Sequence, residues 1–371
     1  MTAHASELPQ LPEPPEFPLV GDDAAAGFRP RRWLANGHLQ TIFGNFLPRQ
    51  HSALPRATSE LVEVAPAHRT QIASQVLCEC FWQPESIRRD RPTAIIVHGL
   101  EGSSRSQYVL GNADKLWRAG CNIVSMNMRN CGGRDYEMAR RTPTLYHSGL
   151  SADVDHVMRY FLQRDHLSSI ALIGYSMGGN LVLKLAGDLG ADAPKELHAV
   201  VGVSPAVDLK ESADALHSLA NRLYEQRFLR ALLKRFRRKA MLFPRAFDPR
   251  VALNVHSIRD FDEHITALYS GFRSADDYYY RAAAARVIDR ITVPTLILHA
   301  TDDPFIRFTS ETRANIENNP HITLVETQHG GHCAFLAEPD ASNDFDGYWA
   351  EHQALRFVLG HAHDEPATLA L

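Results

Sequence analysis

Short apolar runs rich in β-branched residues alternate with helical patterns along most of this chain. The runs that predict buried strands lie at residues 93–99, 122–129, 169–175, 198–204, 295–300 and 322–326. Helical periodicity covers residues 105–119, 150–164, 178–189, 309–318 and 345–359. Near-continuous apolarity is typical of strands in a parallel sheet that is covered on both faces. The alternation therefore predicts an α/β fold with a mostly parallel central sheet and helices on both faces.

Two parts of the chain depart from this rhythm. Residues 58–65 and 73–82 predict two antiparallel strands that lead into the sheet. Residues 208–289 contain no convincing strand, and 223–243 is the clearest of their helical patterns. We therefore expect a helical cap inserted between two strands of the sheet. The predicted organisation is a Pro-rich extension at 1–27, core at 28–207, cap at 208–289, core at 290–361 and a tail at 362–371.

The bulk composition narrows the classes of function. The chain has 371 residues, of which 44% are hydrophobic, so it can bury a large core. Its net charge of −4 gives no general attraction to nucleic acid, and we expect no nucleic-acid partner. No apolar run reaches the roughly 18 residues of a membrane span, and the N-terminal residues do not resemble a signal peptide. The 5 cysteines, an odd number without zinc-site spacing, indicate reduced thiols in a cytoplasmic protein.

The sequence Ile-Gly-Tyr-Ser-Met-Gly-Gly at 173–179 places a serine where a predicted strand passes into a predicted helix. Glycines at 174 and 178 allow the strand and helix to cross closely, which is the nucleophile-elbow pattern G-x-S-x-G. Such a turn exposes the Ser176 hydroxyl above the sheet. The backbone N–H of Met177, at the helix start, is then placed to stabilise an oxyanion.

A serine hydroxyl needs a base to act as a nucleophile at neutral pH. In this arrangement the acid and then the histidine follow the serine along the chain. We choose His332 as the base, because Gly330 and Gly331 free the backbone before it and Phe335 anchors the loop after it. His329 is the alternative. The chosen histidine would take the serine's proton and return it to the leaving group.

The acid comes from the pair Asp302 and Asp303, which follows the predicted strand at 295–300. Adjacent side chains diverge, so only one of them can orient the histidine. We favour Asp303, because it carries the Asp-x-x-apolar spacing, ending at Ile306, that follows this strand in many hydrolases. Asp302 would then cap or brace the loop.

A second oxyanion donor should come from the loop that follows the strand at 93–99. The chain turns at Leu100, whose N–H is our candidate. His98 is expected to brace this turn through hydrogen bonds. The histidines near strand ends show no metal-site spacing, and a glycine pair at 132–133 lacks a phosphate-binding pattern. We therefore expect no metal and no other cofactor.

Several separate motifs resemble one known family. They lie at residues 28–49, 98–109, 127–133, 146–149, 174–180, 279–285, 301–305 and 330–335, and the first contains Asn-Gly-His-Leu-Gln-Thr-Ile. Together they resemble the YheT-like branch of the α/β-hydrolases, which includes related mammalian abhydrolase-domain lipases. Asn130 and Ala334 stand where the family often has glycine. Neither departure touches the proposed triad.

The resemblance implies an α/β-hydrolase fold and a serine hydrolase that cleaves carboxylic esters without a cofactor. In some members the esters are acylglycerols or phospholipids. Two alternatives remain: acyl transfer by the same triad, or a lipid- or partner-binding protein that keeps the fold without catalysis. The expected partner is a small-molecule ester, and the sequence does not indicate an oligomeric state.

The cap helix at 227–243 is both basic and apolar, and it has two interpretations. Its apolar positions share one face, and they could line a slot for an acyl chain: Leu229, Leu232, Leu233 and Phe236. Its basic face is either solvated or attracts anionic lipid head groups, which would give peripheral membrane contact. Because no membrane anchor is evident, we expect short- to medium-chain acyl esters.

Overall fold

An eight-stranded sheet forms the centre of the computed structural model, which describes residues 27–362 except 48, 50, 52, 69, 70, 135 and 136. The strand order is β1-β2-β4-β3-β5-β6-β7-β8. Strands β3 to β8 are parallel to one another, whereas β1 and β2 pair antiparallel at one edge. Most of the predicted extension and tail, 1–26 and 363–371, lies outside the described residues.

Every run that predicted a strand forms one, and the predicted fold class is confirmed. The strands are β1 Thr58–Ala65, β2 Ser74–Phe81, β3 Thr93–Val97, β4 Asn122–Met126, β5 Ile170–Tyr175, β6 Leu197–Val203, β7 Thr295–Ala300 and β8 Ile322–Thr327. Every residue of β3, β4, β5 and β7 is buried. This explains why these strands read as continuous apolar runs rather than alternating ones.

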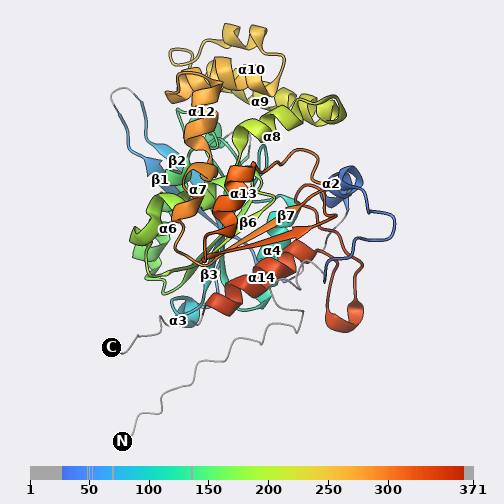
Figure 1. Ribbon diagram of the computed structural model, residues 1–371. Coiled ribbons are helices and arrows are strands. Elements are labelled where there is room, and N and C mark those ends of the chain that lie inside the picture. The colour runs from blue at the N-terminus through green and yellow to red at the C-terminus, as the bar shows by residue number, and fades with distance from the viewer. Residues whose placement is uncertain are drawn as a thin grey trace, which may run out of the picture.

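Helices cover both faces of the sheet and one of its ends (Figure 1). The helices of the first part are α2 Gly37–Phe46, α3 Glu85–Arg88, α4 Gln107–Arg118, α5 Glu137–Arg140, α6 Ser151–Asp165 and α7 Met177–Leu189. Those that follow β6 are α8 Leu209–Leu216, α9 Arg222–Leu242, α10 Ile258–Phe261, α11 Leu268–Ser270 and α12 Ala275–Ala282. After β7 come α13 Ser310–Glu317 and α14 Trp349–His361.

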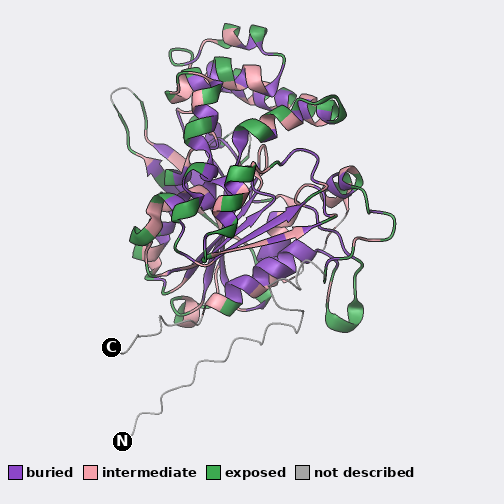
Figure 2. Cartoon of the chain, in the orientation of Figure 1, coloured by how far each residue is buried: buried purple, intermediate pink, exposed green. Residues whose placement is uncertain are grey.

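Neighbouring residues of the central strands point into two different cores. Ile96 and Ile173 pack with α4 and α14 on one face of the sheet. Ile95 and Leu172 pack with α6, α7 and α13 on the other. Successive side chains of a strand point to opposite faces of the sheet. Neighbours such as Ile95 and Ile96 can therefore both be buried only because helices cover both faces. The buried centre is continuous through the sheet in Figure 2.

The helices α8 to α12 stand beyond the carboxyl ends of the strands, at the top of Figure 1. Their buried residues, among them Leu232 and Phe236, belong to the same core cluster as the α6 and α7 face of the sheet. These helices therefore pack continuously onto the sheet domain. None of the described helices is long and apolar enough to cross a membrane.

Candidate active site

Ser176 occupies a strained turn between β5 and α7. Its backbone angles are φ 54° and ψ −117°, a region that residues with side chains rarely adopt. A Cβ on Gly174 would overlap the Gly178 carbonyl, and one on Gly178 would overlap the Val97 carbonyl. The two glycines thus allow strand and helix to cross with almost no space between them, as the sequence pattern predicts.

His332 lies between the serine and the acid. Its Nε2 is 2.9 Å from the Ser176 Oγ, and its Nδ1 is 2.9 Å from the Asp303 Oδ2. The Asp303 side chain is fully buried and that of His332 is 12% exposed. The structure therefore joins the three predicted side chains, which are far apart in sequence, into one hydrogen-bonded chain.

The two neighbouring aspartates make different contacts. The Asp303 Oδ1 accepts hydrogen bonds from the N–H groups of Phe305 and Ile306, each at 3.0 Å, while its other oxygen faces the histidine. Asp302 turns the other way, and its Oδ1 accepts a 2.8 Å hydrogen bond from the Gly331 N–H. His329 lies 3.5 Å from Asp302. Asp302 thus braces the histidine loop through Gly331, and His329 lies beside it.

Burial and charge oppose each other in this pair. Burial alone would raise the pKa of the Asp303 carboxyl, but His332 and the two backbone N–H groups hold that pKa below its ordinary value. Burial lowers the pKa of His332, but the neighbouring Cys333 sulfur and the Asp303 carboxylate together raise it above its ordinary value. An ionised aspartate is thus held beside a histidine whose protonated form it stabilises.

Two backbone N–H groups are available beside the serine. Met177 is the first residue of α7, and Leu100 lies in the turn after β3. Within the described residues neither amide donates a hydrogen bond. His98 braces the turn as expected: its Nδ1 contacts the Gly99 carbonyl at 2.7 Å and its Nε2 accepts from the Met128 N–H at 3.1 Å. Burial lowers the pKa of this histidine to about 4, so it is neutral.

Helix α2 supports the histidine loop, a role that the sequence analysis did not assign. The Thr41 hydroxyl accepts a 2.8 Å hydrogen bond from the His332 N–H. Gln40, which is completely buried, donates to the Leu336 carbonyl at 3.0 Å and accepts from the Leu336 N–H at 2.8 Å. Two adjacent polar residues between apolar positions of this helix are the signal in the sequence. Their partners lie almost 300 positions away and give no local pattern.

Asn180, at the start of α7, connects three of the family motifs. Its amide nitrogen donates to the carbonyls of Ser148 and Ala282, at 2.8 and 3.0 Å. Its oxygen accepts from the Ala284 N–H at 2.8 Å. All of these groups are buried. The motifs that lie far from the triad in sequence therefore hold the helix that follows the serine.

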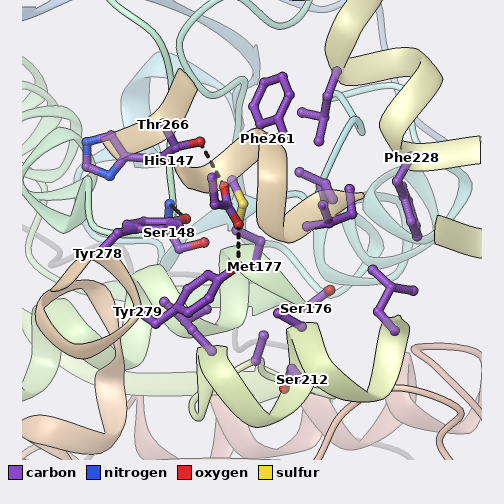
Figure 3. A pocket seen from close by; sticks show the side chains of 18 of the residues that line it. His147, Ser148, Ser176, Met177, Ser212, Phe228, Phe261, Thr266, Tyr278 and Tyr279 are labelled. Carbon is purple, nitrogen blue, oxygen red and sulfur yellow. Dashed lines mark hydrogen bonds between the residues drawn. The ribbon is translucent and has the colours of Figure 1, made fainter. Parts of the chain in front are cut away.

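Two cavities meet at Ser176. The cap cavity lies between the serine and the helices α8 to α12, and it holds about 820 Å³ of empty space, counting its opening (Figure 3). The surface cavity lies on the side of α2 and α9, and it holds about 1350 Å³ on the same measure. Leu100, Ser176, Phe228 and Phe305 line both. His332 lines only the surface cavity.

The expected slot-lining residues of α9 need a correction. Of the four, Leu232 lines the cap cavity, and Phe228, which was not named, joins it. Leu229, Leu233 and Phe236 instead pack into the surrounding core. Phe228 and Leu232 are four residues apart and share one helical face, so the cavity meets the predicted stripe only along the edge that contains Leu232. The helical period of the apolar residues was predicted correctly. Which face of α9 meets the cavity depends on how this helix packs against segments that are remote in the sequence.

The cap cavity also contains a polar group that no sequence pattern predicts. The Asp262 carboxylate accepts 2.8 Å hydrogen bonds from the hydroxyls of Thr266 and Tyr279, drawn as dashed lines in Figure 3. Burial raises the pKa of Asp262 to about 6. Ser212 contributes a buried hydroxyl oxygen without a hydrogen-bond partner in the described structure. Asp262 and Thr266 belong to a short π-helix, Asp262–Ala267, which turns both side chains into the cavity.

Comparisons with known proteins agree with this architecture. A family model for the alpha/beta hydrolase fold matches residues 92–339. YheT of Escherichia coli (strain K12), named as an esterase by inference, is 31% identical over 84% of this chain and 88% of its own length. A monoacylglycerol lipase of Saccharomyces cerevisiae is 25% identical over 90% of this chain and 80% of the lipase. A mutant of the esterase E40 shares the fold with a TM-score of 0.50 at 18% identity, covering 87% and 91% of the two chains.

The match to the family model begins just before β3 and ends after the histidine loop, so it includes the serine, the acid and the histidine. The similarity to YheT extends over most of both chains. The resemblance inferred from separate motifs is therefore confirmed. This chain belongs to the α/β-hydrolase family, in its YheT-like branch.

Proposed function

We propose that this protein is a serine esterase that cleaves carboxylic esters through Ser176, His332 and Asp303. The observation that carries the proposal is the continuous hydrogen-bonded chain from the buried carboxylate through the imidazole to the serine hydroxyl. The same geometry serves nucleophilic acyl transfer on many unrelated scaffolds. The esterase and lipase names of the relatives agree with it.

In the first half-reaction the Ser176 Oγ attacks the ester carbonyl carbon while His332 Nε2 takes the hydroxyl proton. The carbonyl oxygen becomes an oxyanion, which the N–H groups of Leu100 and Met177 stabilise. The imidazolium, held by Asp303, then gives its proton to the alcohol oxygen as the carbon–oxygen bond breaks. The alcohol leaves, and an acyl group remains on the serine.

In the second half-reaction water replaces the alcohol. The imidazole takes a proton from the water as its oxygen attacks the acyl carbon, and the oxyanion forms again in the same place. Collapse of this intermediate breaks the bond to the Ser176 Oγ, which recovers its proton from the imidazolium. The carboxylic acid leaves and the resting enzyme is restored.

The substrates that fit best are short- to medium-chain acyl esters, including acylglycerols. The apolar lining of the cap cavity, which includes Phe228, Leu232 and Phe261, favours an acyl chain on that side of the serine. The surface cavity, which contains His332, receives the alcohol. This assignment places the leaving oxygen on the side of the general acid.

The test is labelling with a fluorophosphonate probe together with turnover of p-nitrophenyl butyrate. We expect covalent labelling at Ser176, and we expect Ser176→Ala to lose both labelling and roughly 10⁴-fold or more of the turnover. Circular dichroism of the variant should be unchanged. A folded wild-type protein that is neither labelled nor active would instead identify a binding protein that keeps the fold. Products formed with added alcohols would distinguish acyl transfer from hydrolysis.

A further inference from the structure

Helix α2 presents an apolar face to solvent. Leu39, Ile42 and Phe46 recur at spacings of three and four and therefore lie on one side of the helix. They are 39%, 41% and 66% exposed. The opposite side of α2 is buried, because Gln40 and Thr41 bind the histidine loop.

A second apolar patch lies at the start of α9. Leu219 and Leu223 are 88% and 81% exposed, more than any other large hydrophobic residue in the described structure. The two patches lie at one junction, because the rings of His38 in α2 and Tyr224 in α9 stack with their centres 5.8 Å apart. Large exposed apolar residues that gather at one place on a surface mark an interaction site.

A basic stripe continues from the second patch. Arg227, Arg230, Lys234 and Arg237 follow Leu223 along α9 at spacings of three and four, and all four are exposed. The acid of this helix, Glu225, is buried and faces away from the stripe. The stripe is locally basic on a chain whose net charge is −4.

These features border the entrance to the proposed active site. Ile42 and Phe46 from α2 and Arg227 from α9 line the surface cavity, whose inner wall contains Ser176 and His332. A partner bound to this surface would therefore cover the entrance of the cavity that leads to Ser176. A protein partner would block it, whereas a lipid surface would itself supply an amphiphilic ester.

We propose that this docking face binds an anionic lipid surface and admits the ester from it. The docking face consists of Leu39, Ile42, Phe46, Leu219, Leu223, Arg227, Arg230, Lys234 and Arg237. Exposed apolar side chains enter the headgroup region while basic ones bind anionic head groups. Two copies of the chain meeting at this face would bring their basic stripes together, which disfavours self-association. The role in substrate delivery rests on the proposed esterase function.

The experiment measures binding of the full chain to vesicles of phosphatidylcholine alone or with phosphatidylglycerol. It uses Ser176→Ala as the background, so binding is measured separately from catalysis. Each basic group near an anionic surface strengthens binding about fivefold. Loss of three basic groups alone should weaken binding on the order of 100-fold, so the triple variant R230E/K234E/R237E, which also adds three negative charges, should weaken it by at least that factor. The matched control R89E/K195E/R290E changes three exposed basic residues outside the docking face and should bind like its parent.

The apolar part has its own pair of variants. L219E/L223E should weaken binding at least tenfold, whereas I72E, at a residue that is 51% exposed outside the docking face, should not. With an active serine, all of these variants should hydrolyse soluble p-nitrophenyl butyrate like the wild type.

The proposal is overturned if vesicle binding is absent, does not depend on phosphatidylglycerol or is equally reduced in the control variants. A dimer, seen by light scattering, that L219E/L223E dissociates overturns it as well. Vesicle binding without any esterase activity would instead reject the proposed function alone.

Discussion

Asp302 and Asp303 are adjacent in the chain, yet one faces the histidine and the other braces its loop. We predict that Asp303→Asn lowers kcat about 10⁴-fold, because the amide no longer holds the imidazole in the productive tautomer. Asp302→Asn should cost far less, since its acceptor oxygen can remain bound to the Gly331 N–H. Steady-state kinetics on a soluble ester, at matched thermal stability, will compare the two. The reverse order would make Asp302 the acid.

The pH profile tests the same pair independently. Activity needs neutral His332, so kcat/KM should fall as the pH drops through the pKa of this histidine. Because Asp303 contributes to raising that pKa, the acid limb should lie above the ordinary histidine value of about 6.5. In Asp303→Asn the acid limb should move to lower pH. Burial lowers the pKa of His332, and the carboxylate that opposes this effect is then missing. Asp302→Asn serves as the control, and a limb that stays in place in Asp303→Asn contradicts the interpretation.

Single residues could be predicted where a local rule applies to them. Ser176, His332 and the close-packed glycines have neighbours in the sequence that reveal the turn around them. Asn130 was identified only as a departure from glycine, and its φ of 66° explains it, since asparagine tolerates this left-handed region better than most residues. Asp262 could not be predicted, because its partners and its cavity exist only after the cap has packed.

At the level of elements, α2 acts as a support for the histidine loop. We predict that Thr41→Val lowers kcat about tenfold with little change in KM, because the His332 N–H loses its acceptor and the ring is held less firmly. An unpaired buried N–H costs roughly 1–3 kcal/mol, so stability should fall as well. Thr41→Ser keeps the hydroxyl and should restore both kcat and the unfolding midpoint. If valine and serine behave alike, the contact does not position the histidine.

The strands and the long helices were predictable because each carries its own period in the sequence. Burial on both faces makes β3, β4, β5 and β7 continuously apolar, and this could be recognised without knowing their neighbours. The lining of the cap cavity was only partly predictable. Which face of α9 meets the cavity depends on how the whole group of helices packs, and a hydrophobic stripe does not contain that information.

At the scale of the whole molecule, the size of the cap cavity would limit the acyl chain of the proposed substrate. We predict that kcat/KM over p-nitrophenyl esters from C2 to C16 rises to medium length and then declines as the chain outgrows the cap cavity. Each methylene that fits should add up to about 0.8 kcal/mol, or roughly fourfold. Leu232→Phe should shorten the preferred chain by occupying the cavity, while the acetyl ester serves as the internal control. A continuous rise to C16 in both proteins would mean that the cap cavity does not hold the chain.

The meeting of two cavities at Ser176 also has a kinetic consequence. If the alcohol leaves through the surface cavity, as we propose, the acyl group would still fill the cap side, and the next nucleophile would have to arrive by the route that the alcohol has vacated. Water and any hydroxyl compound would then compete for access through the surface cavity. The relative concentrations of water and hydroxyl compound in the surface cavity, rather than a separate catalytic group, would set the ratio of free acid to newly formed ester.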